Sequence, residues 1–504
     1  MSAVADVFPA DGPLAFRIRL GARWVATHWL SLVGKLPNQR LALESLVEVR
    51  AHDGPPVQRR AALVCEGSGR PLVYRTIEDG EARSHAFAGE HVEVAGPDGA
   101  FAIARDGAEF LADTYAPGLV AVMAAALRDR APVRTARYHA SFLAVAPCSV
   151  AREGARLTTS HAEVVTLDAA GDVVAIDQPR DGLVAERVAE PRPGWAAEEP
   201  RRPTPRRYAP PGDITVEDLT VATPLGPIGG TLSAPRGDDR VADRLPGALF
   251  LPGTGRPDRH GLVGPRDAGT HQIMDHLARR GVAGLRCDVV ATDRLADRIA
   301  LAHAQLAVLR AHPRCDGRIA VIGHSQGGGV ALALAAAHPG EVAAVVLLAA
   351  PGRPVEDVLV DQLHRMAEAQ GWPPSAVAAE LEELHLRCAC ARDDRPLDGD
   401  GVPDRLRWRA RAQPWLADQV RASARDPMLG VACPVLICQG TADALISLAD
   451  ARALHAAARR AGVRADLALF DGLDHCFQRG GDAVDPSVLD HLSGWILAML
   501  ERKD

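Results

Sequence analysis

Apolar runs alternate with helical segments through the second part of the chain, and this alternation restricts the fold more than any other feature. Helical patterns lie near residues 269–281, 292–312 and 326–338. The runs around them are almost continuously apolar and read PGALFLPG, VAGLRCD, RIAVIGHS, VAAVVLLAAP and PVLICQG. Strands that are apolar on both faces are typical of a parallel sheet covered by helices on both sides. We therefore expect an α/β fold with a mostly parallel, doubly wound sheet, which begins with the strands TVEDLTVATP and PIGGTLSAP.

The first part of the chain has a different periodicity. Short runs with alternating polarity, such as LVEVRAHDG, AALVCEG, PLVYRTIEDG and HVEVAG, are separated by Gly, Asp or Pro, which is typical of antiparallel strands. One helical segment is expected at about 112–129, and more strands follow as far as LVAERV. FRIRL alternates like a strand, whereas ARWVATHWLSLV could form an amphipathic helix, so this stretch stays ambiguous. The pattern predicts an antiparallel β-rich α+β domain with a curved sheet packed on one helix.

A proline-rich stretch separates the two parts. Residues 190–212 contain seven prolines, which join neither helix interiors nor strand ladders. We expect an N-terminal β-rich domain at 1–189, a linker at 190–212 and a catalytic domain at 213–504. Residues 356–430 are helical in pattern and interrupt the strand–helix alternation, so we expect them to form a lid inserted over the carboxyl edge of the sheet, where open α/β folds bind ligands.

A glycine-rich junction follows the strand RIAVIGHS. It reads Gly323-His324-Ser325-Gln326-Gly327 and leads into an alanine-rich helical segment. A tight turn between strand and helix needs small neighbours and lifts the central side chain out of the sheet, as in a nucleophile elbow. The Gln326 amide, at the start of the helix, would then face a developing oxyanion. A phosphate-binding loop would need Lys and Ser or Thr after its last glycine, and the sequence lacks them there.

An acid and a base follow the serine in the chain. Asp443 comes just after the strand PVLICQG, where a carboxylate can accept a hydrogen bond from a histidine, and Asp471 and Asp474 are weaker rivals. His475 follows the strand at 467–470, while its rival His455 lies in a helical pattern. The order serine, aspartate, histidine predicts a catalytic triad.

The second oxyanion donor is expected in the loop after PGALFLPG. This loop reads PGTGRPDRHG, and its glycines allow backbone amides to approach a ligand closely. Thr254 is the first choice for the amide donor and Gly253 the second. A dinucleotide-binding fingerprint would need a third glycine where the chain has Asp258.

Together these residues resemble the α/β-hydrolase superfamily of serine esterases and acyl hydrolases, over about 213–504. In the closest group, the first loop has the form HGSGP-x-DR-x-G and the elbow reads GHSxGG. In this chain the corresponding loop reads PGTGRPDRHG and the elbow reads GHSQGG. The resemblance implies that Ser325, Asp443 and His475 are nucleophile, acid and base. Pro252 replaces a histidine that braces the loop in that group. The last strands of the N-terminal part resemble, more loosely, the curved sheets of lipoprotein-carrier-like domains.

Composition excludes several classes of protein. The net charge of −7 and the pI of about 6.2 argue against nucleic-acid binding. Nine cysteines without framework spacing argue against a disulfide scaffold, and the CxC of Cys388 and Cys390 has no second pair at zinc-ligand spacing. We expect no metal and no cofactor. No signal peptide and no apolar run long enough for a membrane helix is apparent, so a cytoplasmic location is expected.

The sequence therefore predicts a serine hydrolase that cleaves a carboxylic ester or thioester through an acyl-enzyme on Ser325. The alternative is an acyltransferase or thioesterase whose carrier-bound or lipid-like acyl group is delivered by the N-terminal domain, and a non-catalytic binding protein ranks third. The partner would be a small acyl substrate. Candidate side chains for the lining of an acyl pocket in the lid are Leu359, Leu363, Met366, Trp372 and Trp415, and ordinary packing is the more frequent role for each of them. The identity of the acyl group and the oligomeric state are not encoded in any motif.

Overall fold

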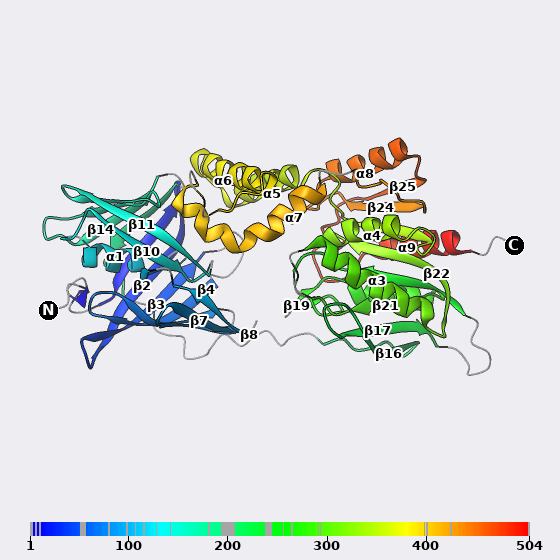
Figure 1. Ribbon diagram of the computed structural model, residues 1–504, viewed down its shortest axis with the longest axis horizontal. Helices are drawn as coiled ribbons and strands as arrows, with labels where there is room; N and C mark the ends of the chain where they lie inside the picture. Colours follow the sequence, from blue (N-terminus) through cyan, green and yellow to red (C-terminus); the bar gives the residue numbers. More distant parts are fainter. Residues whose placement is uncertain are drawn as a thin grey trace. The chain divides into compact units, whose positions relative to one another are not determined.

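The protein consists of two compact units in the computed structural model (Figure 1). The structure describes residues 4–501 apart from 6–7, 10–11, 51–56, 79–80, 97–98, 106, 114–115, 128, 142, 180–181, 192, 194–206, 237–243, 256, 264–265, 291, 293, 398, 400–401 and 424–425. Unit 1 comprises Met1–Arg202 and Leu363–Pro414, and unit 2 comprises Pro203–Gln362 and Trp415–Asp504. Most of the expected linker lies outside the described residues.

Unit 1 contains a 15-stranded sheet, which confirms the β-rich N-terminal domain. Its order runs from β8 down to β1 and then from β15 down to β9, so the first and last strands are neighbours. Neighbouring strands are antiparallel, except that β9 and β10 are parallel. The strands are β1 (Leu14–Leu20), β2 (Arg23–Leu36), β3 (Arg40–Val49), β4 (Val57–Glu66), β5 (Pro71–Glu78), β6 (Glu81–Ala88), β7 (His91–Gly96), β8 (Gly99–Ala104), β9 (Ala108–Ala112), β10 (Val133–His139), β11 (Ala144–Glu153), β12 (Arg156–Thr159), β13 (Val164–Leu167), β14 (Val173–Gln178) and β15 (Leu183–Val188).

Helix α1 (Pro117–Leu127) lies in the core of this unit. Ten of its 11 residues are buried, because it is apolar on every face and contributes to two hydrophobic clusters. The expected helix at 112–129 is thus confirmed with shorter bounds. The ambiguous stretch ARWVATHWLSLV is part of β2, which is paired on both sides with β1 and β3, so strand pairing decided against a helix.

The middle of the inserted segment packs with unit 1. The insertion forms α5 (Val355–Gln370), α6 (Pro374–Arg392), the 3₁₀-helix η2 (Asp404–Ala412) and α7 (Gln413–Ser423). Trp372 and Ala376 pack in the same hydrophobic cluster as strands β1 and β2. The Pro373 ring lies so close to Gly182 that a Cβ there would be 2.5 Å from it. The apolar side of α6 is therefore buried against the N-terminal sheet.

Unit 2 contains an eight-stranded sheet in the order β16-β17-β21-β18-β22-β23-β24-β25. Strand β17 is antiparallel to both of its neighbours, β16 and β21. The remaining neighbours, in the order β21-β18-β22-β23-β24-β25, are parallel, which confirms the expected doubly wound α/β sheet. Its strands are β16 (Ile214–Val221), β17 (Ile228–Pro235), β18 (Leu245–Leu251), β21 (Ala283–Cys287), β22 (Cys315–His324), β23 (Ala344–Leu348), β24 (Val435–Gly440) and β25 (Ala465–Phe470). A small hairpin is formed by β19 (Leu262–Val263) and β20 (Arg266–Asp267).

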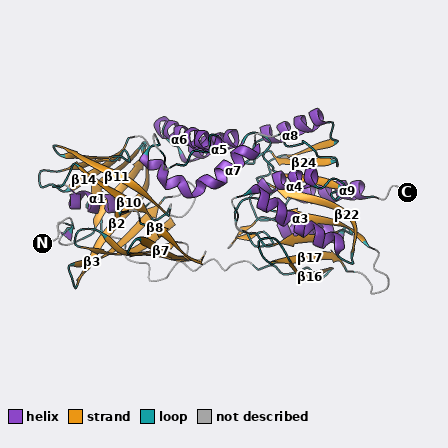
Figure 2. Ribbon diagram, in the orientation of Figure 1, coloured by secondary structure: helices purple, strands orange, loops and turns teal. Residues whose placement is uncertain are grey.

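Helices cover both faces of this sheet (Figure 2). On one face lie α3 (Leu295–Ala311), α4 (Gln326–Ala337) and α8 (Leu448–Ala461); on the other lie α2 (Thr270–Arg279) and α9 (Pro486–Leu500). Along β18, Leu249 and Leu251 pack toward the first face, whereas Ala248 and Phe250 pack toward the second. Burial on both faces explains why the strand sequence is apolar without alternation.

No disulfide is formed between cysteines in the part of the chain that the structure describes. In the described part of the chain, no helix has the length and apolarity needed to cross a bilayer.

Candidate active site

Ser325 occupies a sharp turn between β22 and α4. Its backbone has φ 53° and ψ −126°, a conformation that is unfavourable for a side-chain-bearing residue. The flanking glycines make the turn sterically feasible: a Cβ on Gly323 would lie 2.4 Å from the Gly327 oxygen, and a Cβ on Gly327 would lie 2.2 Å from the Leu251 oxygen. The turn is held by a 2.8 Å hydrogen bond from the Ser325 amide to the Leu348 carbonyl.

Asp443 and His475 are hydrogen bonded to each other. His475 Nδ1 lies 2.9 Å from Asp443 Oδ2, and the Asp443 side chain is fully buried. The other carboxylate oxygen accepts from the amides of Leu445 and Ile446 at 2.7 and 2.9 Å. Burial by itself would raise the pKa of Asp443, but the hydrogen bond and charge of His475 and these two amides hold it below its ordinary value. Asp443 is therefore an ionised acceptor that fixes the ring of His475.

These groups all follow parallel strands of one sheet. Ser325 comes directly after β22, Asp443 follows β24, and His475 follows β25. Because parallel strands end at the same edge of a sheet, Ser325, Asp443 and His475 lie on that edge.

The rival residues have other partners. Asp471 accepts from the hydroxyl of Thr441 at 3.0 Å. Asp474 Oδ1 accepts from the amides of Cys476 and Gln478, so it holds the turn of the histidine loop. His455 lies within α8.

The loop after β18 lies against the serine. A Cβ on Gly253 would be 2.8 Å from the Ser325 Cβ, so a side chain would not fit there. Gly253 is buried and Thr254 is exposed. Gln326 is the first residue of α4, where a backbone N–H has no partner within the helix. The candidate oxyanion residues are thus placed on two segments that meet at the nucleophile.

His324 holds the loop of His475, a role that no motif in the sequence predicted. Its Nε2 lies 2.9 Å from the carbonyl oxygen of His475. Since a carbonyl only accepts, this nitrogen must carry a proton. Burial and the neighbouring His475 lower the pKa of His324 to about 4, so the ring is neutral at pH 7. Its position before the nucleophile was the only signal in the sequence.

Tyr208 anchors the far end of the loop after β18. Its ring stacks on His260 with centroids 4.2 Å apart, and its hydroxyl donates to Asp275 at 2.9 Å. The buried Arg286 donates from Nε to His260 Nδ1 at 3.1 Å, which requires that nitrogen to be unprotonated. Burial and the nearby Arg286 accordingly lower the pKa of His260 to about 4. The last part of the expected linker is therefore packed on this loop.

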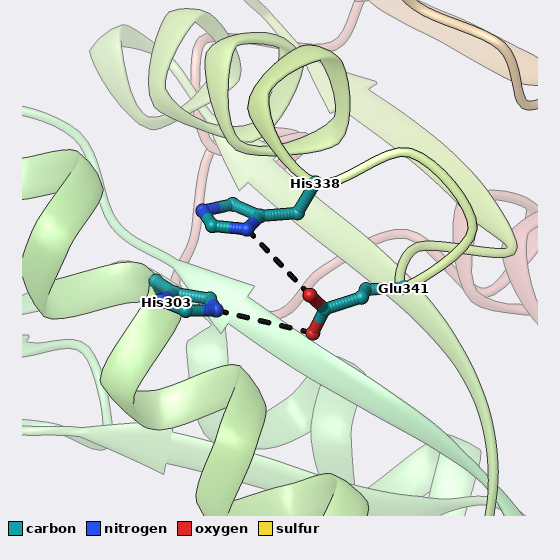
Figure 3. A group of neighbouring side chains, drawn as sticks. All are labelled: His303, His338 and Glu341. Atoms are coloured by element: carbon teal, nitrogen blue, oxygen red, sulfur yellow. Dashed lines mark ion pairs between the residues drawn. The ribbon is translucent and has the colours of Figure 1, made fainter.

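One group of side chains among the described residues has the composition of a metal site. His303 Nε2 and His338 Nδ1 lie 3.9 and 3.6 Å from the two oxygens of Glu341 (Figure 3). The two rings are stacked, with centroids 3.7 Å apart and planes within 9°. A metal is bound in the plane of an imidazole at about 2.0–2.1 Å, and parallel planes share no such point. The group as arranged is a stacked histidine pair beside a carboxylate, and we assign no metal to it.

Comparison with known proteins finds a family match in the C-terminal part of the chain. Residues 279–479, less than half of the chain, match the family model Hydrolase_4, described as "Serine aminopeptidase, S33". None of the curated proteins matches significantly.

Solved structures with similarity to the chain include three hydrolases. A dienelactone hydrolase from Anabaena variabilis is 17% identical with a TM-score of 0.35, covering 57% of this chain and 100% of its own. The Pyrococcus furiosus esterase Pf2001 is 15% identical with a TM-score of 0.39, covering 59% and 97%. The esterase from Pyrobaculum calidifontis is 18% identical with a TM-score of 0.37, covering 56% and 86%. The match to the family model, the sheet order and the turn at Ser325 agree that the C-terminal part of this chain has the α/β-hydrolase fold.

Proposed function

We propose that the protein is a serine hydrolase that cleaves a carboxylic ester or thioester through an acyl-enzyme on Ser325. The observation that carries the proposal is the 2.9 Å contact between His475 Nδ1 and the buried Asp443, at the sheet edge where Ser325 occupies its strained turn. A histidine that donates from Nδ1 to a carboxylate keeps Nε2 free to accept a proton.

Each step of the reaction uses a group at this edge. His475 Nε2 takes the proton of the Ser325 hydroxyl as Oγ bonds to the acyl carbon. The amides of Gln326 and of Thr254, or alternatively Gly253, stabilise the oxyanion that forms on the carbonyl oxygen. The same Nε2 returns the proton to the departing alcohol or thiol. Water then attacks the acyl-enzyme, with His475 again as base, and releases the acid and the free serine.

Fluorophosphonate labelling tests the nucleophile. Wild type and Ser325→Ala would be labelled and assayed on p-nitrophenyl esters of rising chain length, on acyl thioesters and on aminoacyl anilides. We expect labelling and ester turnover in wild type and neither in the variant. An aminoacyl anilide cleaved in preference to every ester would favour the activity in the name of the matching family, and unlabelled wild type would overturn the proposal.

The packing of the insertion supports a second candidate, an acyltransferase or thioesterase for a carrier-bound or lipid-like acyl group. Residues Leu363–Pro414 are inserted in the hydrolase sequence but form one compact unit with the N-terminal sheet. A ligand held by that unit would therefore act directly on a segment of the insertion. Turnover of long-chain thioesters with an added alcohol acceptor tests for acyl transfer: transfer to the alcohol at millimolar concentration favours the acyltransferase. Exclusive hydrolysis with p-nitrophenyl esters as the better substrates favours the first candidate, and exclusive hydrolysis with long-chain thioesters as the better substrates favours the thioesterase.

A further inference from the structure

Arg298 of α3 joins the two segments that flank Ser325. Its Nη2 donates to the carbonyl oxygens of Pro252 and Gly253 at 2.9 and 3.2 Å. Its Nη1 donates to Oε1 of Gln326. One guanidinium therefore ties the loop after β18 to the first residue of α4.

These contacts determine where the loop amides point. In a trans peptide, the C=O and the N–H point in opposite directions. In the described part of the chain the single cis peptide is Ala131–Pro132, so the two peptides around Gly253 are trans. When both carbonyls face Arg298, the amides of Gly253 and Thr254 are turned to the other side of the loop. Gly253 itself lies against the Ser325 Cβ.

The guanidinium also brings a charge that its contacts leave uncompensated. All three of its acceptors are neutral amide oxygens, and no ion pair to it is found among the described residues. Burial lowers the pKa of Arg298 from its ordinary value, which reflects the cost of holding this charge away from water. A positive charge fixed near the acyl site favours a transition state that develops negative charge.

We propose that Arg298 is the positioning residue of the oxyanion hole: it holds the loop amides and Gln326 in register, in the place of the histidine that Pro252 replaces. The inference rests on the proposed function for its effect on rate. It explains how a loop that begins with proline can still present its amides to the reaction.

The test compares Arg298→Met and Arg298→Lys with wild type, and uses Arg294→Met as the control because Arg294 is exposed at the start of the same helix. We expect Arg298→Met to lower kcat about 10²-fold with little change in KM, in line with the loss of one oxyanion donor. Binding of a trifluoromethyl ketone, which mimics the tetrahedral adduct, should weaken by a similar factor. Arg298→Lys should retain an intermediate kcat. In a further variant, Arg298→Ala, added free guanidinium should restore part of the lost activity.

The outcomes separate this inference from the proposed function. Wild-type turnover that persists in Arg298→Met would overturn the role of Arg298 and leave the serine hydrolase intact. Absence of fluorophosphonate labelling in wild type would instead overturn the hydrolase. Hydrogen exchange of the Gly253–Gly255 amides gives a readout that needs no activity: faster exchange in Arg298→Met than in Arg294→Met supports the bracing role, and equal exchange refutes it.

Discussion

The side chain of His324 holds the main chain of His475, with Nε2 2.9 Å from the carbonyl oxygen. The residue before Ser325 thus fixes the loop that carries His475. Asp443 fixes the ring of the same histidine from its Nδ1 side. The backbone of His475 is therefore restrained from the end of β22, and its ring is restrained from the end of β24.

Replacing His324 should impair turnover without altering the pH profile. His324→Leu removes the donor to the His475 carbonyl, and we expect kcat to fall about tenfold, the value of a hydrogen bond worth roughly 1–1.5 kcal/mol. His324→Gln keeps an N–H donor and should recover part of the loss. The acid limb of the plot of kcat/KM against pH should stay in place in both variants. With a pKa of about 4, His324 is already neutral at every pH above about 5 and does not contribute to that limb. A shifted limb would mean that His324 titrates with the base.

Asparagine at position 443 should abolish most activity while the fold persists. Asp443→Asn removes the charge that holds the His475 ring, and in a Ser-His-Asp arrangement this change costs about 10⁴-fold in kcat. Asp471→Asn is the matched control, since Asp471 is bonded to Thr441 and not to His475. Steady-state kinetics with the two variants would contradict the assignment if Asp471→Asn were the slower enzyme.

Alanine substitutions at the glycines after Ser325 should change the free energy of unfolding in opposite directions. A Cβ on Gly328 would lie 2.4 Å from the Ala350 Cβ, and one on Gly327 would lie 2.2 Å from the Leu251 oxygen, so either substitution should cost about 1–3 kcal/mol or more. Gly329 has open space around a Cβ and lies within α4, so Gly329→Ala should stabilise by about 0.5–1 kcal/mol. Urea unfolding of the three variants checks the order, and a destabilised Gly329→Ala would count against it.

Unit 1 should lose stability as the pH falls below neutrality. His28 is buried, accepts from the Gly118 amide at 3.0 Å, and has a pKa lowered to about 3 by burial. Because the unfolded chain binds a proton near pH 6.5 and the folded chain does not, the stability is full above pH 6.5 and is lost as the pH falls toward 3. The slope for one such group is about 1.4 kcal/mol per pH unit. His139, also lowered to about 3 by burial, adds to it.

Denaturant unfolding at pH 7.5 and pH 5 measures this dependence, with hydrogen exchange to assign the transition to unit 1. His28→Gln should reduce the slope of the free energy of unfolding against pH by the contribution of one titrating group, roughly 1.4 kcal/mol per pH unit. An unchanged slope in this variant would show that His28 is not a source of the acid sensitivity.

Removing the N-terminal domain alone should yield an insoluble product. Deletion of residues 1–202 exposes the apolar surface of the insertion, including Trp372 and Ala376, which is buried against the N-terminal sheet. Deletion of 1–202 together with replacement of 363–414 by a flexible linker should give a soluble hydrolase unit. Size-exclusion chromatography and circular dichroism compare the two. Equal solubility would show that the insertion does not depend on the sheet.

The sequence determined the features that depend on neighbours along the chain. The apolar runs around the helices predicted the parallel sheet, and the glycines around Ser325 predicted the turn, since both follow from local sterics and burial. The order of Ser325, Asp443 and His475 along three strands was enough to propose a triad. The local sequence of β2 fits a helix as well as a strand. Its pairing with β1 and β3 decided that it is a strand.

Tertiary structure alone decided which distant segments meet. Residues 363–414 lie within the hydrolase sequence but bury their apolar side in the N-terminal unit, and helical periodicity says that a face is buried without saying against what. Arg298 belongs to no motif, and its place beside Pro252, Gly253 and Gln326 results from the crossover that packs α3 against α4 and β18. Hydrogen bonds between residues far apart in sequence follow from the path of the chain through the sheet, which no local pattern records.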